Sequence, residues 1–106
     1  MTQYDLQTIL RRLEEVSINE WNFDGDRHYL IYEYRADFGS LKLFKNRDSN
    51  HIHLLVYDTS LNLMNEVHNV ESVFNPICDK LQLYRENIVS GARERDENKF
   101  INWLEM

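Results

Sequence analysis

The feature that most constrains the fold is a change in the spacing of apolar residues near position 57. Before that point, apolar and polar residues alternate over short stretches, as they do in strands with one buried face. After it, apolar residues recur in steps of four and three, which is the spacing of one face of a helix. The members of this helical seam are Leu63, Val67, Val70, Phe74, Ile77, Leu81 and Tyr84. The pattern predicts an α+β fold, in which a small antiparallel sheet is followed by helices.

Four strands are expected in the alternating part of the chain. Asp24-Gly25 predicts a tight hairpin turn between the first two strands, because such turns need residues that tolerate positive φ. Short polar connections between the other strands predict a four-stranded antiparallel meander. A short fifth strand over residues 61–63, which also alternate, is the alternative to an early helix start. The expected strand ranges are Asn19–Phe23, Arg27–Arg35, Leu41–Lys45 and His51–Asp58.

Helices are expected before the first strand and after the last strand in the chain. Thr2 can cap the first helix, with Asp5 reaching back as in a capping box, and the helix fades near Ser17. The second helical region begins near Thr59 and meets Pro76, which removes a backbone donor and clashes with the preceding turn. Because the seam stays in phase across this proline, we expect two co-directional helices with a kink. The N-terminal helix and the C-terminal helices should pack on one face of the sheet.

Length and charge limit the class of protein. With 106 residues, of which 42% are hydrophobic, the chain is expected to form a single domain over residues 1–106. Its net charge of −6 disfavours binding to nucleic acid or to anionic membranes, because both depend on Lys and Arg. No signal-like or membrane-spanning stretch is visible, which favours the cytoplasm. The single cysteine, Cys78, cannot form an internal disulfide and is expected to be buried.

The sequence does not contain the motifs that usually mark catalysis. It has no phosphate-binding glycine pattern and no nucleophile elbow. His51 and His53 point to one side of a predicted strand, and Asp48, Asp58 or His68 could supply a third metal ligand. Polar rings on a strand surface are the simpler interpretation of this pair. We therefore expect a protein that is not an enzyme and that needs no cofactor or metal.

Two features of the first hairpin favour binding to another protein. One is an acidic stretch between residues 14 and 26 that contains no Lys or Arg, and such a patch speeds encounter with a basic partner. The other is a surplus of aromatic residues, which are common at the centres of protein interfaces. The residues expected to contact the partner are Glu14, Glu20, Trp21, Asp24, Asp26, Tyr29 and Tyr32.

The chain closes with large apolar residues after a charged segment, residues 92–99. Ser90-Gly91 is expected to end the preceding helix. The apolar residues at the end must dock on their own domain, on a second copy or on another protein. They are Phe100, Ile101, Trp103 and Leu104.

These observations predict a small acidic binding module of the inhibitor, immunity or adaptor type, which covers a basic surface of a protein partner. The alternative is a homodimeric structural or regulatory protein, assembled through the helical seam or the C-terminal apolar segment. A metal-dependent enzyme built around His51 and His53 is a third hypothesis.

Overall fold

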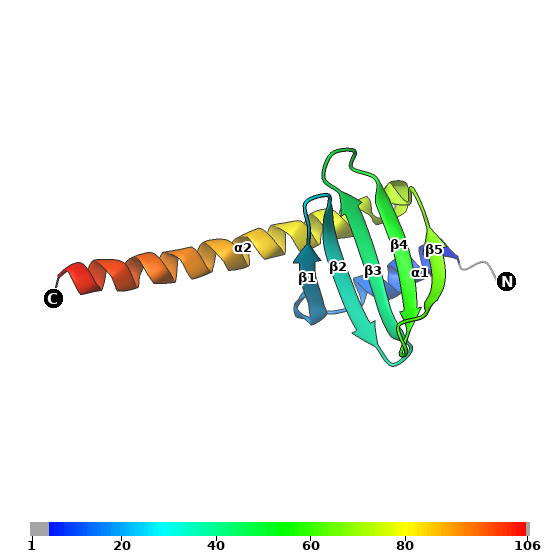
Figure 1. Ribbon diagram of the computed structural model, residues 1–106, viewed down its shortest axis with the longest axis horizontal. Coiled ribbons are helices and arrows are strands. Elements are labelled where there is room, and N and C mark those ends of the chain that lie inside the picture. The colour runs from blue at the N-terminus through cyan, green and yellow to red at the C-terminus, as the bar shows by residue number, and fades with distance from the viewer. Residues whose placement is uncertain (1–4, 106) are drawn as a thin grey trace.

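The computed structural model describes residues 5–105, apart from the side chains at 89, 90 and 92, and it has an α+β architecture (Figure 1). Five strands form one antiparallel sheet in chain order, so the predicted class and the antiparallel meander are confirmed. The elements are α1 (Leu6–Glu14), the short 3-10 helix η1 (Ile18–Glu20), β1 (Trp21–Gly25), β2 (Tyr29–Ala36), β3 (Gly39–Asn46), β4 (Ile52–Asp58), β5 (Leu63–Val67) and α2 (Glu71–Leu104).

The core lies between one face of the sheet and the two helices, which lie behind the sheet in Figure 1. Alternate residues of the strands point to this face, and the start of α2 covers them. At its centre, the Tyr32 hydroxyl donates a hydrogen bond of 2.9 Å to Oε1 of Gln82 on α2. Cys78 is buried as predicted, and burial raises the pKa of its thiol to about 12. The buried apolar residues are Leu13, Trp21, Tyr32, Leu41, Leu43, Ile52, Leu54, Val70, Phe74, Ile77, Cys78 and Leu81.

The sheet has one strand more than the four that were predicted. Leu63 and Val67, which were assigned to the helical seam, lie in β5 and pair with Tyr57 and Leu54 of β4. The chain reverses here because Oδ1 of Asp58 accepts hydrogen bonds from two backbone amides of the turn, those of residues 60 and 62. The helix therefore starts at residue 71 instead of near Thr59. The alternative of a short fifth strand is the one that the structure shows.

The first hairpin turns two residues later than predicted. Asp24 and Gly25 are still paired in β1, opposite Ile31 and Leu30. The turn is made by Asp26, whose Oδ1 accepts hydrogen bonds of 2.8 Å from the backbone amides of both residue 28 and residue 29. A side-chain acceptor in the loop outweighs the preference of Asp-Gly for a two-residue turn.

The helix ends also differ from the prediction in two places. The cap of α1 is Asp5, whose carboxylate accepts from the amide of Gln7, whereas Thr2 lies outside the described residues. The two co-directional helices expected around Pro76 form one element, because α2 is assigned as a single helix that contains this proline. Pro76 comes five residues after the helix start, so it removes only the bond to Ser72. The buried Phe74 and Ile77, on both sides of the proline, keep the helix on the sheet.

The second half of α2 leaves the sheet as a projecting arm, residues 86–104 (Figure 1). Among the hydrogen bonds of the described residues, the last that joins α2 to the sheet runs from Arg85 Nη1 to the Asp24 carbonyl oxygen, at 3.5 Å. A helix rises 1.5 Å per residue, so the arm is about 28 Å long. The radius of gyration is 17.1 Å, whereas a compact domain of this length has about 13 Å. The predicted helix end at Ser90-Gly91 is wrong, because α2 runs on to Leu104.

The turn between β4 and β5 contains a backbone strain that a substitution can relieve. Leu61 has a φ of 66° and its side chain is 79% exposed. A leucine in this left-handed region is unfavourable, and its exposed side chain contributes little packing. We expect Leu61→Gly to raise the free energy of unfolding by about 0.5–1 kcal/mol, measured by urea denaturation. Leu61→Val, which is β-branched, should lower it, and a less stable glycine variant would contradict this assignment of strain.

Candidate functional site

The acidic residues of the first hairpin do not form one patch. Glu14 ends α1 and Glu20 precedes β1, while Asp24 and Asp26 lie at the opposite end of that strand. Five strand residues span about 16 Å, so the two pairs are well separated. At the hairpin end, Arg85 contacts the Asp24 carbonyl oxygen, and Arg47 Nε donates to the Asp26 carbonyl oxygen at 3.0 Å. The carboxylates are therefore spread along one sheet edge, and guanidinium groups lie beside those at the hairpin.

Two of the aromatic residues expected at the interface lie in the core instead. Trp21 is 5% exposed and Tyr32 is fully buried, so neither side chain offers a surface to a partner. Burial raises the pKa of the Tyr32 phenol to about 12. Both residues are on strand faces that the helices cover, where their large apolar area stabilises the fold.

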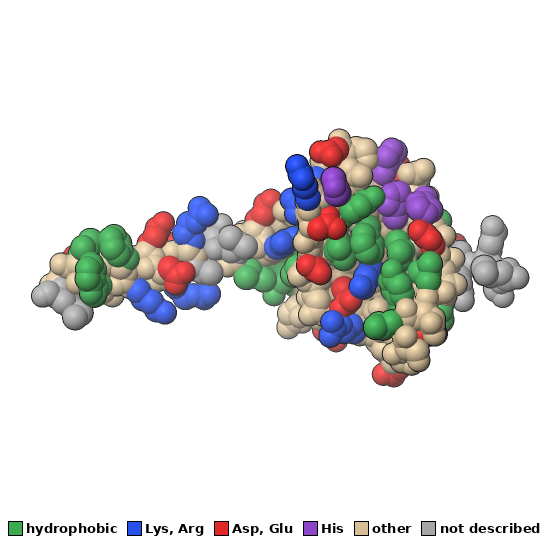
Figure 2. All heavy atoms as spheres, viewed as in Figure 1, with side chains coloured by type: hydrophobic (Ala, Val, Ile, Leu, Met, Phe, Trp, Pro, Cys, Tyr) green, Lys and Arg blue, Asp and Glu red, His purple; other side chains and the backbone are tan. Residues whose placement is uncertain are grey.

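Tyr29 lies on the other face of the sheet, which no described helix covers and which faces the viewer in Figure 2. Here aromatic and aliphatic side chains pack against one another across the strands. The Tyr29 and Phe44 rings meet edge to face at 5.8 Å, and Lys42 Nζ lies 5.2 Å from the centre of the Tyr57 ring. Each of these side chains is partly buried by its neighbours. This face carries both polar and apolar side chains, and these side chains largely cover one another. It is therefore a weak candidate for a docking surface.

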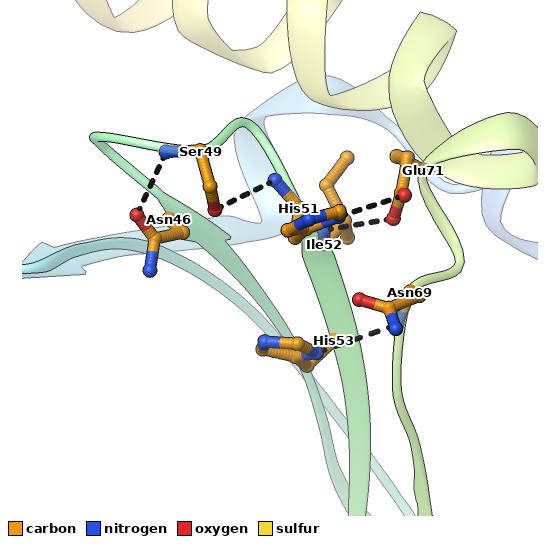
Figure 3. A network of polar contacts seen from close by, with 7 residues as sticks. All are labelled: Asn46, Ser49, His51, Ile52, His53, Asn69 and Glu71. Carbon is orange, nitrogen blue, oxygen red and sulfur yellow. Dashed lines mark hydrogen bonds and ion pairs between the residues drawn. The ribbon is translucent and has the colours of Figure 1, made fainter.

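The histidine pair lies at the start of β4, where it anchors α2 (Figure 3). His51 Nδ1 lies 2.9 Å from Oε1 of Glu71, and this contact lowers the pKa of the Glu71 carboxyl. Oε2 of Glu71 accepts from the amide of Ile52 at 3.3 Å. His53 Nδ1 accepts from the backbone amide of Asn69 at 3.4 Å, in the link between β5 and α2. The two histidines therefore hold the start of the helix on the sheet.

This arrangement does not converge on a metal ion. Of the proposed third ligands, only His68 lies near His53, with ring centres 4.6 Å apart, and its Nε2 contacts Glu66 at 3.0 Å. Within residues 5–105, no group of three or more potential ligand side chains is close enough to hold an ion. The hypothesis of a metal-dependent enzyme at His51 and His53 therefore gains no geometric support from this part of the chain.

The histidine network has a consequence for the pH dependence of stability. Burial lowers the pKa of His53, and the neighbouring His68 and His51 lower it further. Below the unfolded-state value of about 6.5, the unfolded chain therefore takes up a proton more readily than the folded chain. We expect the free energy of unfolding to fall between pH 7 and pH 5.5. Urea denaturation should show a smaller fall for His53→Gln, and an equal fall in both proteins would refute this role.

The most unusual surface is at the end of the arm. The tip, defined as Phe100, Ile101, Trp103 and Leu104, has exposed fractions of 59%, 48%, 65% and 61%. The Phe100 and Trp103 rings stack with centres 6.2 Å apart. The sequence predicted docking on the chain's own domain as one of three outcomes, and the structure excludes it because the arm carries the tip away from the sheet.

An apolar groove lies between α1 and the ends of the central strands. This groove has a volume of about 680 Å³ and is lined mainly by apolar side chains. Arg12, Glu15 and Glu20 stand among the residues that line it. Sequence reasoning missed the groove, because the turn residue Phe38 and Met64 of β5 meet α1 only in the folded chain. Its apolar side chains include Ile9, Val16, Tyr34, Phe38, Leu41, Val56 and Met64.

No helix in residues 5–105 is both long enough and apolar enough to cross a membrane. Comparison with protein-family models, with curated proteins and with solved structures found no match to this chain.

Proposed function

We propose that the protein is a small non-enzymatic binding module that contacts a protein partner through the tip of its projecting arm. The observation that carries the proposal is the exposure of four large apolar side chains within the last two turns of α2. Isolated exposed apolar residues are common, but a cluster of this kind usually marks an interaction site. Tryptophan is also among the residues that contribute most to interface energy.

The arm is poorly stabilised by its own chain. Most helical stability in proteins comes from packing of an apolar face, and none of the described side chains of the arm belongs to the core cluster or packs against it. Among the described ion pairs, none joins two residues of the arm, although its middle section contains six charged residues, 93–97 and 99. A partner that covers the tip supplies the missing packing.

The tip is also turned, as a whole, partly away from the stripe that packs on the sheet. At 100° per residue, Phe100 and Leu104 are turned by about 100° and 140° around the helix axis from Leu81, the last fully buried residue among the described side chains of α2. Trp103 is turned by about 40° from Leu81 and so stays close to the line of the buried stripe. Phe100, Trp103 and Leu104 share one face, because they are three and four residues apart. The tip is therefore centred on a different side of α2 from the buried stripe and stands at the end of the arm, away from the sheet, which supports a separate binding role (Figure 1). The acidic stretch between residues 14 and 26 is not part of the proposed binding surface, because its carboxylates do not form one patch.

The proposal is tested by capture of proteins from a lysate of the source cells on the immobilised protein. We compare the wild-type chain with Phe100→Asp/Trp103→Asp, which places charge on the tip. The wild-type chain should retain a discrete protein, including a second copy of itself if copies pair, and the tip variant should lose it.

Leu83→Asp is the matched control, because Leu83 is 59% exposed on the same helix but lies outside the tip. This variant should retain the same protein as the wild-type chain. Equal recovery with the wild-type and tip variants would show that the tip is not the contact surface.

A further inference from the structure

We infer that the partner of the tip is a second copy of this chain, and that the tip of each copy occupies the groove of the other. This inference rests on the proposed function, since it identifies the partner of the same surface. The assembly is a two-fold dimer in which the two arms are exchanged between the bodies.

The exposed large apolar residues in the described part of the chain fall into two groups, one on α2 and one at an end of the sheet. One group belongs to α2 and ends in the tip. The other group lies at one end of the sheet: Phe38 and Met64, which are 46% and 37% exposed, line the groove, whereas the exposed Leu61 and Leu63 are not among its lining residues. The tip and the groove are both apolar surfaces exposed to water, so contact between them would cover both at once.

These two surfaces cannot meet within one molecule. The arm is a continuation of α2, whose first half is held on the sheet by Phe74 and Leu81, both of which are buried. The groove lies beside α1, behind the sheet, while the arm extends beyond its β1 edge (Figure 1). The molecule is 65 Å long, and the tip is at one extreme of this length. Contact between tip and groove therefore requires two copies.

The area available is sufficient for a dimer when both contacts form. Side chains of the tip are about half exposed, and large apolar side chains contribute about 150–250 Å² each, so one tip offers on the order of 450 Å². Covering it in a groove buries on the order of 900 Å² in total, which is small for a stable interface. A two-fold axis that places one tip in its partner's groove also places the second tip in the first groove. Two contacts bury on the order of 1,800 Å², within the range of stable dimers.

The experiment uses the purified 106-residue chain, and the first measurement is its mass by sedimentation equilibrium over a concentration range. The wild-type chain should reach twice its 12.9 kDa mass. The tip variant Phe100→Asp/Trp103→Asp and a groove variant, Phe38→Glu/Met64→Glu, should both remain monomers. The groove residues are more than one third exposed, so both variants should fold, which circular dichroism confirms before the mass is measured. Met64→Glu alone is the second groove variant if the pair does not fold.

Mixing the two variants is the decisive step. The tip variant keeps an intact groove and the groove variant keeps an intact tip, so an equimolar mixture can form one of the two contacts. Native mass spectrometry should show a heterodimer in the mixture and no dimer in either variant alone. Its dissociation constant should exceed that of the wild-type dimer at least tenfold, because one contact is missing.

Salt dependence separates a second copy from a basic partner. Two copies with a net charge of −6 repel each other, so raising the salt concentration from 0.05 to 0.5 M should tighten the dimer. A contact with a basic partner weakens over the same range.

The inference is overturned if the wild-type chain is monomeric at all concentrations, if either variant still dimerises, or if the mixture forms no heterodimer. A monomer whose tip still captures a different protein from a lysate overturns the inference and leaves the proposed function standing. A monomer whose tip captures nothing overturns both.

Discussion

Trp103→Ala is expected to weaken binding by about 30-fold or more while leaving the stability of the fold unchanged. Truncation of an interface tryptophan commonly costs 2 kcal/mol or more of binding free energy, and about 1.4 kcal/mol corresponds to a factor of ten. Trp103 is 65% exposed, and its aromatic contact among the described residues is with Phe100 at the tip, so its loss from the free protein should change the free energy of unfolding by less than about 0.5 kcal/mol. Titration calorimetry with the captured partner, or dimer dissociation if the partner is a second copy, measures the first effect.

The chain contains a matched control for this variant in its other tryptophan. Trp21 is 5% exposed and its ring lies 5.9 Å from that of Tyr34. Trp21→Ala should lower the free energy of unfolding by about 3–5 kcal/mol, because it removes a large core side chain. If Trp103→Ala destabilised the fold as much as Trp21→Ala, the tip would be a structural element and not a binding surface.

Phe74→Ala is expected to be among the most destabilising single substitutions, with a loss of about 3–5 kcal/mol in the free energy of unfolding. Phe74 is fully buried in the first turns of α2 and packs in the core cluster with strand residues. The substitution removes a ring and leaves a cavity at the point where the helix is attached to the sheet. Because a domain of this size is stable by only about 5–15 kcal/mol, the loss is a large part of the total.

Urea denaturation followed by circular dichroism measures this loss. Phe38→Ala is the control, because Phe38 is 46% exposed in the turn between β2 and β3 and should cost well under 1 kcal/mol. A loss below about 1 kcal/mol for Phe74→Ala would mean that α2 is not anchored through this residue. Attachment of α2 to the sheet at Phe74 could then not explain the direction of the arm.

The strands and the buried stripe of α2 could be predicted from the sequence because their signals are local. Alternation placed β2, β3 and β4 within about two residues of their bounds, and the spacing from Val70 to Leu81 placed the stripe that covers the sheet. The errors arose where two local signals competed. Leu63 and Val67 fit both a helical and a strand period. They form a strand because Oδ1 of Asp58 accepts hydrogen bonds from the turn before them, and this turn reverses the chain. At Asp26, a side-chain acceptor likewise moved the first turn.

The candidate site was less predictable, because exposure is a property of the folded chain. The apolar end of the sequence was recognised as needing a contact, but whether Trp103 reaches its own domain depends on α2 continuing straight through Gly91. Trp21 and Tyr32 were assigned to an interface because aromatic residues serve cores and interfaces equally well. Their burial follows from the side of the sheet that the helices cover. The groove had no local signal at all.

The most direct test of a binding role for the tip is cross-linking at the tip itself. A photo-activated amino acid is placed at Asn102, between Ile101 and Trp103, in the protein produced in its own cells. The account predicts a discrete cross-linked product that disappears when Phe100→Asp is added and that is absent when the probe is at Asp48, an exposed turn residue. A product yield at Asn102 no higher than that at Asp48 would contradict it, because a covered surface must have a neighbour within reach.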